Sequence, residues 1–152
     1  MTPLLAIPIF FAQGAALGAD EFIFHRRRGL PRWERLGHPV DTFSVLLCLG
    51  ATLILPVRQP WTGIYFGLAL FSCLLVTKDE WVHTSLCPPA EHWLHALLFL
   101  LHPALLWAVY RLWSDGEAFS RQLLQGEAAL CAVFMGYQIL YWNFPWRRSP
   151  SR

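Results

Sequence analysis

The sequence predicts an all-α integral membrane protein, a polytopic helical bundle with about five transmembrane helices. Of its 152 residues, 55% are hydrophobic and 14% are charged, whereas an average soluble domain is about 25% charged. Several apolar runs approach the ~20 residues that a helix needs to cross a bilayer. A soluble chain of this length could not bury all of them, because a small domain leaves much of its surface in water.

The expected spans follow the apolar runs and form a single domain over residues 1–152. No Lys or Arg precedes the first span, so we expect it to be retained and not cleaved as a signal peptide. Between the second and third spans, Pro56 and Pro60 favour a turn over one continuous helix. In the fifth segment, Glu127 and Gln138 leave open a four-span alternative in which this segment lies in the membrane interface. The five spans cover about 3–24, 40–57, 62–80, 92–113 and 122–144.

Basic residues predict the orientation of the chain, because cytoplasmic loops of membrane proteins are enriched in Lys and Arg. The loop after the first span and the C-terminal tail carry most of them. We therefore expect the N-terminus outside and the C-terminus in the cytoplasm, in a bacterial inner membrane or its equivalent. The basic residues on this side are Arg26, Arg27, Arg28, Arg32, Arg35, Lys78, Arg147, Arg148 and Arg152.

The acidic and histidine residues are concentrated in two short windows that resemble each other. Of ten Asp and Glu and six His, all but Asp115, Glu117 and Glu127 fall in residues 20–41 and 79–102. A Pro-x-x-Glu-x-x-x-His pattern occurs in both windows at an offset of 57 residues, and an Asp-Glu pair recurs at an offset of 59. The pattern predicts an internal parallel repeat of two tandem helical hairpins. Repeat 1 covers about 3–57, repeat 2 covers about 62–113, and an additional helix covers about 122–144.

Each of the first four helices carries one Glu and one His three or four residues apart, so the two side chains share a helix face. All four pairs are expected at the same membrane depth, because helix ends and helix starts alternate along the chain. Carboxylates can bridge two divalent ions, imidazole suits iron and zinc, and helical bundles build di-iron sites from inward Glu and Glu-x-x-His motifs. The candidate metal ligands are Glu21, His25, Glu34, His38, Glu80, His83, Glu91 and His95.

We therefore expect two divalent metal ions, with Fe preferred and Zn or Mn possible. Further residues near the pairs are expected to support the site as auxiliary groups, for example by orienting imidazoles. In the last helix, Gln138 and Tyr141 are three residues apart and are candidates for the wall of a substrate cavity. The auxiliary residues are Asp20, Asp41, Asp79, His92 and His102.

Structural explanations compete with the metal site. The Asp-Glu pairs could be interfacial charges that pair with the arginine loop. Glu34 and Glu91 each follow a proline by three residues and could be first-turn acids that complement a helix dipole. His102 could make a hydrogen bond between helices, and the polar residues of the last helix could do the same.

The function that this pattern favours is a membrane metalloenzyme with a dinuclear, preferably di-iron, Glu/His site near the cytoplasmic face. Its substrate would be a lipid-like, isoprenoid or quinone-type molecule from the bilayer, oxidised with O2 with the help of an electron donor. One alternative is a di-zinc hydrolase of a lipid ester or phosphate. Another is a b-type haem electron carrier without enzymatic activity, and a third is an ion transporter. No nucleic-acid partner is expected, because the net charge is only +2.

Overall fold

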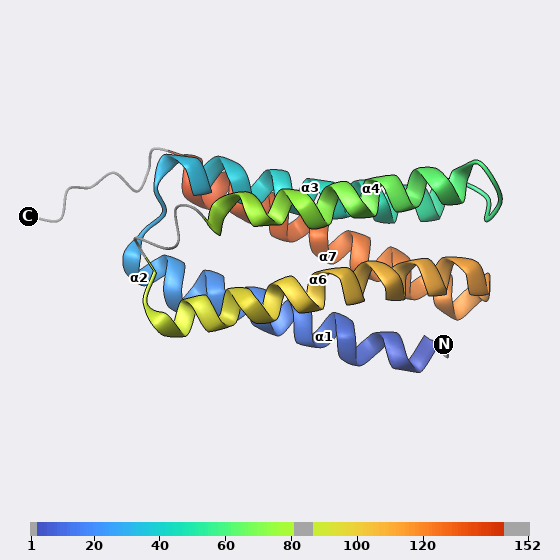
Figure 1. Cartoon of the computed structure of the whole chain (residues 1–152), viewed down its shortest axis with the longest axis horizontal. Helices are drawn as coiled ribbons and strands as arrows, with labels where there is room; N and C mark the ends of the chain where they lie inside the picture. The colour runs from blue at the N-terminus through green and yellow to red at the C-terminus, as the bar shows by residue number, and fades with distance from the viewer. Residues whose placement is uncertain (1–2, 81–86, 145–152) are drawn as a thin grey trace, which may run out of the picture.

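The computed structural model describes residues 3–80 and 87–144, apart from the side chain of Asp79. Within these residues the chain is a bundle of helices (Figure 1). The first span begins as α1, continues through a π-helical segment, η1, and ends as a short α2. The third span likewise ends in a short 3-10 segment, η2. The elements are α1 Pro3–Ala19, η1 Asp20–His25, α2 Arg26–Arg28, α3 Arg32–Ile54, α4 Trp61–Leu75, η2 Val76–Asp79, α6 Pro89–Asp115 and α7 Ala118–Asn143.

Five helices of the described chain are long and apolar enough to span a membrane: Pro3–Arg28, Arg32–Ile54, Trp61–Lys78, Pro89–Asp115 and Ala118–Asn143. Large apolar side chains cover the outside of the bundle, among them Phe11 at 77% exposed and Leu100 at 73% exposed. Such a surface is unfavourable in water and favourable in hydrocarbon. The expected all-α membrane bundle is therefore confirmed.

The second helix is the one whose predicted start differs most from the structure. We expected it to begin near residue 40, whereas α3 begins at Arg32 and continues through Pro39. Both α3 and α6 follow an extended proline, Pro31 and Pro88 respectively, which provides the N-cap residue. As a consequence Glu34 and Glu91 lie in the first turn of their helices, as the dipole explanation predicted.

The helices lie side by side along the long axis of the molecule, with the described connection from α2 to α3 at one end and the α3–α4 turn at the other (Figure 1). The closest packing joins α3 to α7, α1 to α6 and α3 to α4. The first helix of each predicted hairpin thus packs on the second helix of the other hairpin. Exchanging the two hairpins would leave this pairing unchanged, but the internal repeat itself stays a prediction.

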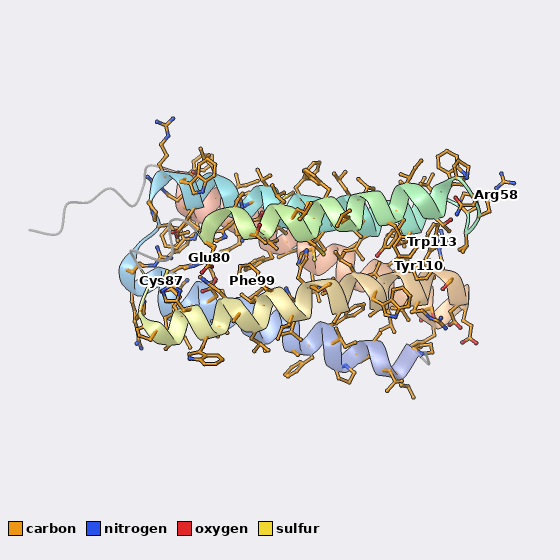
Figure 2. The ribbon with its side chains drawn as sticks, viewed as in Figure 1. Arg58, Glu80, Cys87, Phe99, Tyr110 and Trp113 are labelled. Carbon is orange, nitrogen blue, oxygen red and sulfur yellow. The ribbon has the colours of Figure 1, made fainter. Side chains whose placement is uncertain are left out.

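The end of the bundle near the α3–α4 turn holds most of the apolar core. Leu49 and Tyr65 are fully buried there with Leu112, and the Tyr65 hydroxyl donates a 2.6 Å hydrogen bond to the Leu106 carbonyl. Figure 2 shows Tyr110 and Trp113 at this end, where their rings pack against Tyr65. Indole and phenol rings bury large apolar areas, so this end supplies packing, and the other end carries the buried charges described next.

Candidate metal centre

Buried carboxylates and imidazoles meet at the end of the bundle where α1 ends and α3 and α6 begin. Two groups of His, Asp and Glu there have potential ligand atoms within 4.8 Å of one another. The first group is Asp20, His25, Glu91 and His95, and all four residues are buried. The second is His25, Glu34 and His38, which shares His25 with the first. A buried cluster of this composition could hold a metal ion.

The π-helical segment explains how His25 reaches two acids of its own helix. In an α-helix His25 would face Glu21, four residues before it, and would turn away from Asp20. A π-turn closes over five residues and is frequent at functional sites. In the structure His25 Nδ1 lies 3.3 Å from Glu21 Oε2, and His25 Nε2 lies 3.2 Å from Asp20 Oδ2.

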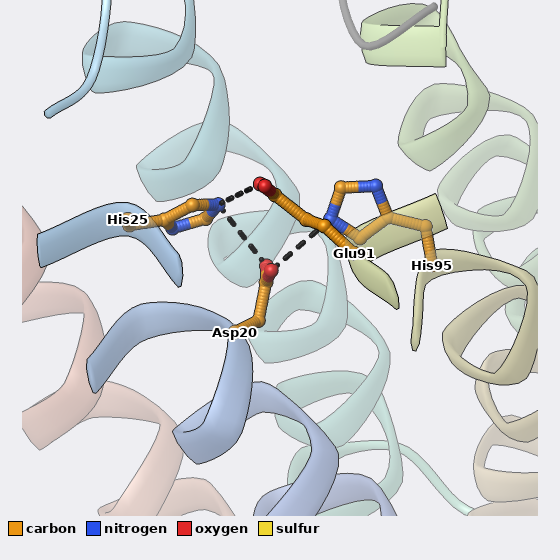
Figure 3. A group of neighbouring side chains, drawn as sticks. All are labelled: Asp20, His25, Glu91 and His95. Atoms are coloured by element: carbon orange, nitrogen blue, oxygen red, sulfur yellow. Dashed lines mark hydrogen bonds and ion pairs between the residues drawn. The ribbon is translucent and has the colours of Figure 1, made fainter. Parts of the chain in front are cut away.

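Asp20 connects the two halves of the first group (Figure 3). Its Oδ1 lies 3.1 Å from His95 Nε2 on α6, while its Oδ2 faces His25. Glu91 Oε1 lies 3.8 Å from His25 Nε2. The expectation for Asp20 was an auxiliary role, but its two oxygens lie between two imidazoles, where they occupy the position expected of a ligand.

Arg28 is the member of the cluster that the sequence reasoning missed. Its Nη2 lies 2.8 Å from Glu34 Oε2 and donates a 2.9 Å hydrogen bond to Glu91 Oε1. Its Nε also donates to Glu91 Oε1, at 3.2 Å. The sequence predicts a topological role for the arginines of this loop, with ion pairs to the Asp-Glu pairs as an alternative, whereas Arg28 pairs with Glu34 and Glu91. A signal was available, because Arg28 follows Glu21 by seven residues, or about two helical turns, and so shares its face.

The charges of the cluster do not balance with neutral histidines. The Arg28 guanidinium contacts two of the four buried carboxylates, and the exposed Arg26 interacts electrostatically with Glu21, so negative charge remains in excess. Burying uncompensated charge is costly, so such groups are paired or coordinate metals. Divalent metal ions or protonated imidazoles would supply the missing positive charge. The carboxylates are Asp20, Glu21, Glu34 and Glu91, and the imidazoles are His25, His38 and His95.

Glu21 is held by α7 as well as by His25. The Tyr137 hydroxyl donates a 3.0 Å hydrogen bond to Glu21 Oε1, and Trp142 Nε1 donates another at 2.7 Å. Both donors come from the last helix, which has no partner in the predicted repeat. Because one oxygen of Glu21 already accepts two hydrogen bonds, Glu21 is better placed to orient His25 than to bind an ion with both oxygens.

The third predicted Glu-His pair of the chain, Glu80 and His83, is the one that the structure describes least. His83 lies outside the described residues, as does the side chain of Asp79. The side chain of Glu80 is 42% exposed and lies 4.0 Å from His92 Nδ1. Glu80 and Cys87 lie at this end of the bundle (Figure 2). Burial and the neighbouring Glu91 raise the pKa of the Cys87 thiol to about 12.

The other predicted residues line or flank a cavity that extends from the cluster toward the middle of the bundle. Asp41 accepts hydrogen bonds from Lys78 Nζ at 2.6 and 2.7 Å. His102 Nε2 lies 2.9 Å from Ser72 Oγ, which is the interhelical hydrogen bond that we had weighed as its structural role. Gln138 is buried and accepts a 2.8 Å hydrogen bond from Thr42.

This cavity, of about 370 Å³, lies between α1, α3, α6 and α7. Asp20, His38 and His95 form part of its wall, so the cluster opens onto it. Most of the remaining wall is apolar, with Phe99 and Phe134 among the aromatic residues. Gln138 lines the cavity, and its role in holding a substrate stays a prediction. Tyr141 is not among the lining residues described and packs instead on Tyr137 and against the Arg26 guanidinium.

Searches against known proteins add no relative to this description. No family model matches the chain, and no curated protein or solved structure matches it either. The fold and the site alone define its class: a helical protein of membrane-spanning character with a buried carboxylate–imidazole cluster that could hold a metal ion.

Proposed function

We propose that the protein is a membrane metalloenzyme that holds two divalent metal ions, preferably iron, and oxidises a lipid-like substrate with O2. The observation that carries the proposal is the excess of buried negative charge in the cluster, next to a cavity with mostly apolar walls. Carboxylate and imidazole together are the ligands of many iron sites that activate oxygen. A cavity of this size is in the range that binds small molecules.

The two overlapping groups suggest how the ligands divide. Asp20, Glu91 and His95 would hold one ion, and Glu34 and His38 would hold the other. His25 belongs to both groups and, as a neutral imidazole, would bind only one of the ions. The two ions would then take their carboxylates from three different helical segments, and helical bundles likewise build dinuclear sites from inward acids on several helices.

The residues of the chain would supply binding, orientation and proton transfer around the ions. The apolar wall would hold the substrate and exclude water, with the reacting carbon toward Asp20, His38 and His95. Tyr137, Glu21 and His25 form a hydrogen-bonded chain that could carry a proton to the site. The ions would supply oxygen activation when bound. In a hydroxylation, one oxygen atom enters a C–H bond and the other leaves as water, which takes two electrons and two protons from a donor.

In the haem alternative, His25 and His38 are one possible pair of axial ligands, and their geometry disfavours it. The His25 and His38 rings lie with centroids 4.9 Å apart and planes 31° apart. A haem between two axial imidazoles needs the rings end-on to the iron from opposite sides, and this close, tilted arrangement leaves no room for it. The zinc hydrolase would use the same residues with a different metal and a different reaction, so metal content separates the two.

The test is elemental analysis of protein purified in detergent. We expect about two metal ions per chain in the wild type, iron before zinc or manganese, and loss of most of the metal in Glu34→Ala and Glu91→Ala. Glu117→Ala is the matched control, because Glu117 is exposed at the opposite end of the bundle and should leave the metal content unchanged. Glu91→Gln keeps the side-chain shape and serves if the alanine variant does not fold.

Two results would end the proposal. One is wild-type protein that contains no metal after purification without chelator and takes up none from ferrous or zinc salts. The other is unchanged metal content in both glutamate variants. Zinc in place of iron, with no visible absorption, would move the reaction to hydrolysis and would end the oxidase assignment alone.

A further inference from the structure

A second layer of polar side chains lies deeper in the membrane-spanning bundle, on the wall of the same cavity. It includes Gln13 on α1, His102 on α6 and Glu127 on α7. Polar residues at this depth are costly in a membrane and commonly mark substrate or ion paths. The proposed metal centre uses none of the three.

The helix register places the three residues at one level. Asp20, the first residue of η1 directly after α1, is hydrogen-bonded to His95 on α6, and α1 and α6 run antiparallel (Figure 1). Gln13 precedes Asp20 by seven residues and His102 follows His95 by seven, so both lie about 10 Å deeper than that pair.

Glu127 reaches a similar level from α7. Glu127 lies ten residues, or about 15 Å, before Tyr137, which is hydrogen-bonded to Glu21. Gln13 lies eight residues, or about 12 Å, before Glu21. The helices α1 and α7 run in the same direction (Figure 1), so the two side chains lie near each other in depth. The Glu21–Tyr137 hydrogen bond fixes this register.

Gln13 is the residue of this layer that points to a ligand. Its side chain is 6% exposed, and its carbonyl oxygen Oε1 is buried without a hydrogen-bond partner among the described residues. Buried amide oxygens are almost always paired with a donor, so an unpaired one needs an explanation. Because Gln13 lines the cavity, a donor on a bound molecule would satisfy it.

The position of the layer favours a binding site over a path across the membrane. Phe10, less than one turn beyond Gln13 toward the N-terminus, is the last α1 residue on the described cavity wall. Further along α1, Ala6 is fully buried in the apolar core. An ion path across the membrane would need further polar groups between Phe10 and the N-terminal end of α1. A ligand site needs only a cavity with one fixed polar contact near its inner end.

We infer that the cavity binds a lipid-soluble alcohol or phenol whose hydroxyl donates to Gln13 Oε1, about 10 Å along the helix from the carboxylate–imidazole cluster. The inference deepens the proposed function and rests on it only in calling this molecule the substrate. The hydroxyl would fix the depth of the molecule in the cavity. One part of its carbon skeleton would then lie beside the cluster, and the reaction would be selective for that position.

The test compares two probes that differ in one donor, para-hexylphenol and its methyl ether, para-hexylanisole. Tritiated forms of each are bound to the protein in phosphatidylcholine nanodiscs treated with chelator, and the signal of empty nanodiscs is subtracted. We expect wild-type protein to bind the phenol about tenfold more tightly than the ether, the effect of one hydrogen bond at a buried acceptor. Gln13→Met keeps the length of the side chain and removes the acceptor, so it should abolish this preference.

Gln125→Met is the matched control, because Gln125 is an exposed residue of α7 that does not line the described cavity, and it should keep the tenfold ratio. Equal binding of phenol and ether by wild-type protein would overturn the inference without any variant. An unchanged ratio in Gln13→Met would overturn it as well. Since the binding is measured without metal, a failed metal analysis with a retained phenol preference would remove the proposed chemistry and leave the ligand site.

Discussion

The two ends of the bundle are built by different physical means. Near the α3–α4 turn, Leu49 and Tyr65 pack in an apolar, aromatic core with Trp113. At the other end, Glu34 and Glu91 are as deeply buried as that core, but their neighbours are an arginine and imidazoles. Both ends are buried from solvent, but only the end with Glu34 and Glu91 buries charged side chains.

The comparison separates stability from function. Apolar packing stabilises a helical membrane protein without further ligands. Buried ion pairs are weak contributors to stability, because desolvation offsets most of the Coulomb attraction. A chain that needed only to fold would gain nothing from four carboxylates at one end. The charged end is therefore where we expect responses to metal, and the apolar end is where we expect responses to packing alone.

The largest expected effect is the removal of the guanidinium between the two glutamates. Arg28→Met should destabilise metal-free protein by about 3 kcal/mol, because it leaves two buried carboxylates without their cation. Adding the bound metal should restore a large part of this loss, since the ions would neutralise the same carboxylates. The measurement is reversible unfolding in mixed micelles, followed by tryptophan fluorescence with and without metal.

Arg121→Met provides the comparison at the apolar end, where the side chain of the exposed Arg121 donates a 3.4 Å hydrogen bond to the Leu53 carbonyl. Its effect should stay within about 0.5 kcal/mol. If Arg28→Met costs the same free energy of unfolding with and without metal, the metal does not neutralise the carboxylates that Arg28 contacts. The proposed difference between the two ends of the bundle would then be wrong.

A packing change should affect the other end and leave the metal site intact. Leu49→Ala should destabilise the protein by about 2 kcal/mol, because it opens a cavity in a fully buried part of α3. Leu47→Ala, two residues away and 40% exposed, should cost much less. Metal content should equal that of the wild type in both variants. A loss of metal in Leu49→Ala would show that the two ends are coupled.

The sequence was sufficient to predict the helices, because hydrocarbon demands long apolar runs and the chain has five of them. Even the start of α3 was within reach, since Pro31 marks an N-terminus more clearly than the apolar run that begins near residue 40. Which helices pack against each other was harder to predict from the sequence. A hairpin in the sequence does not say which neighbour each helix packs on, and α1 packs most closely on α6.

The site was predicted in part, because spacing rules assume a regular α-helix. They placed Glu21 beside His25 and, through the matched glutamates of the two windows, brought Glu34 and Glu91 to one level. They could not place Asp20, whose contact with His25 depends on the π-turn. Contacts from α7 were equally hidden, because nothing in the spacing of Tyr137 relates it to a carboxylate 116 residues earlier.

The smallest expected effect comes from removing a single tyrosine hydroxyl at each end of the bundle. Tyr137→Phe removes a hydrogen bond to Glu21 and should cost about 1 kcal/mol, since Trp142 still donates to the same oxygen. Tyr110→Phe is the control at the apolar end, where no hydrogen bond of the Tyr110 hydroxyl is found among the described residues.

Since Tyr137 holds Glu21 and Glu21 holds His25, the Tyr137 variant should also bind metal several-fold more weakly, as changes behind a ligating histidine commonly do. Competition with a chelator measures this affinity, and Tyr110→Phe should leave it unchanged. Equal metal affinity in the two variants would confine the role of Tyr137 to packing, and the contact between α7 and the charged end would then be structural, as it is at the apolar end.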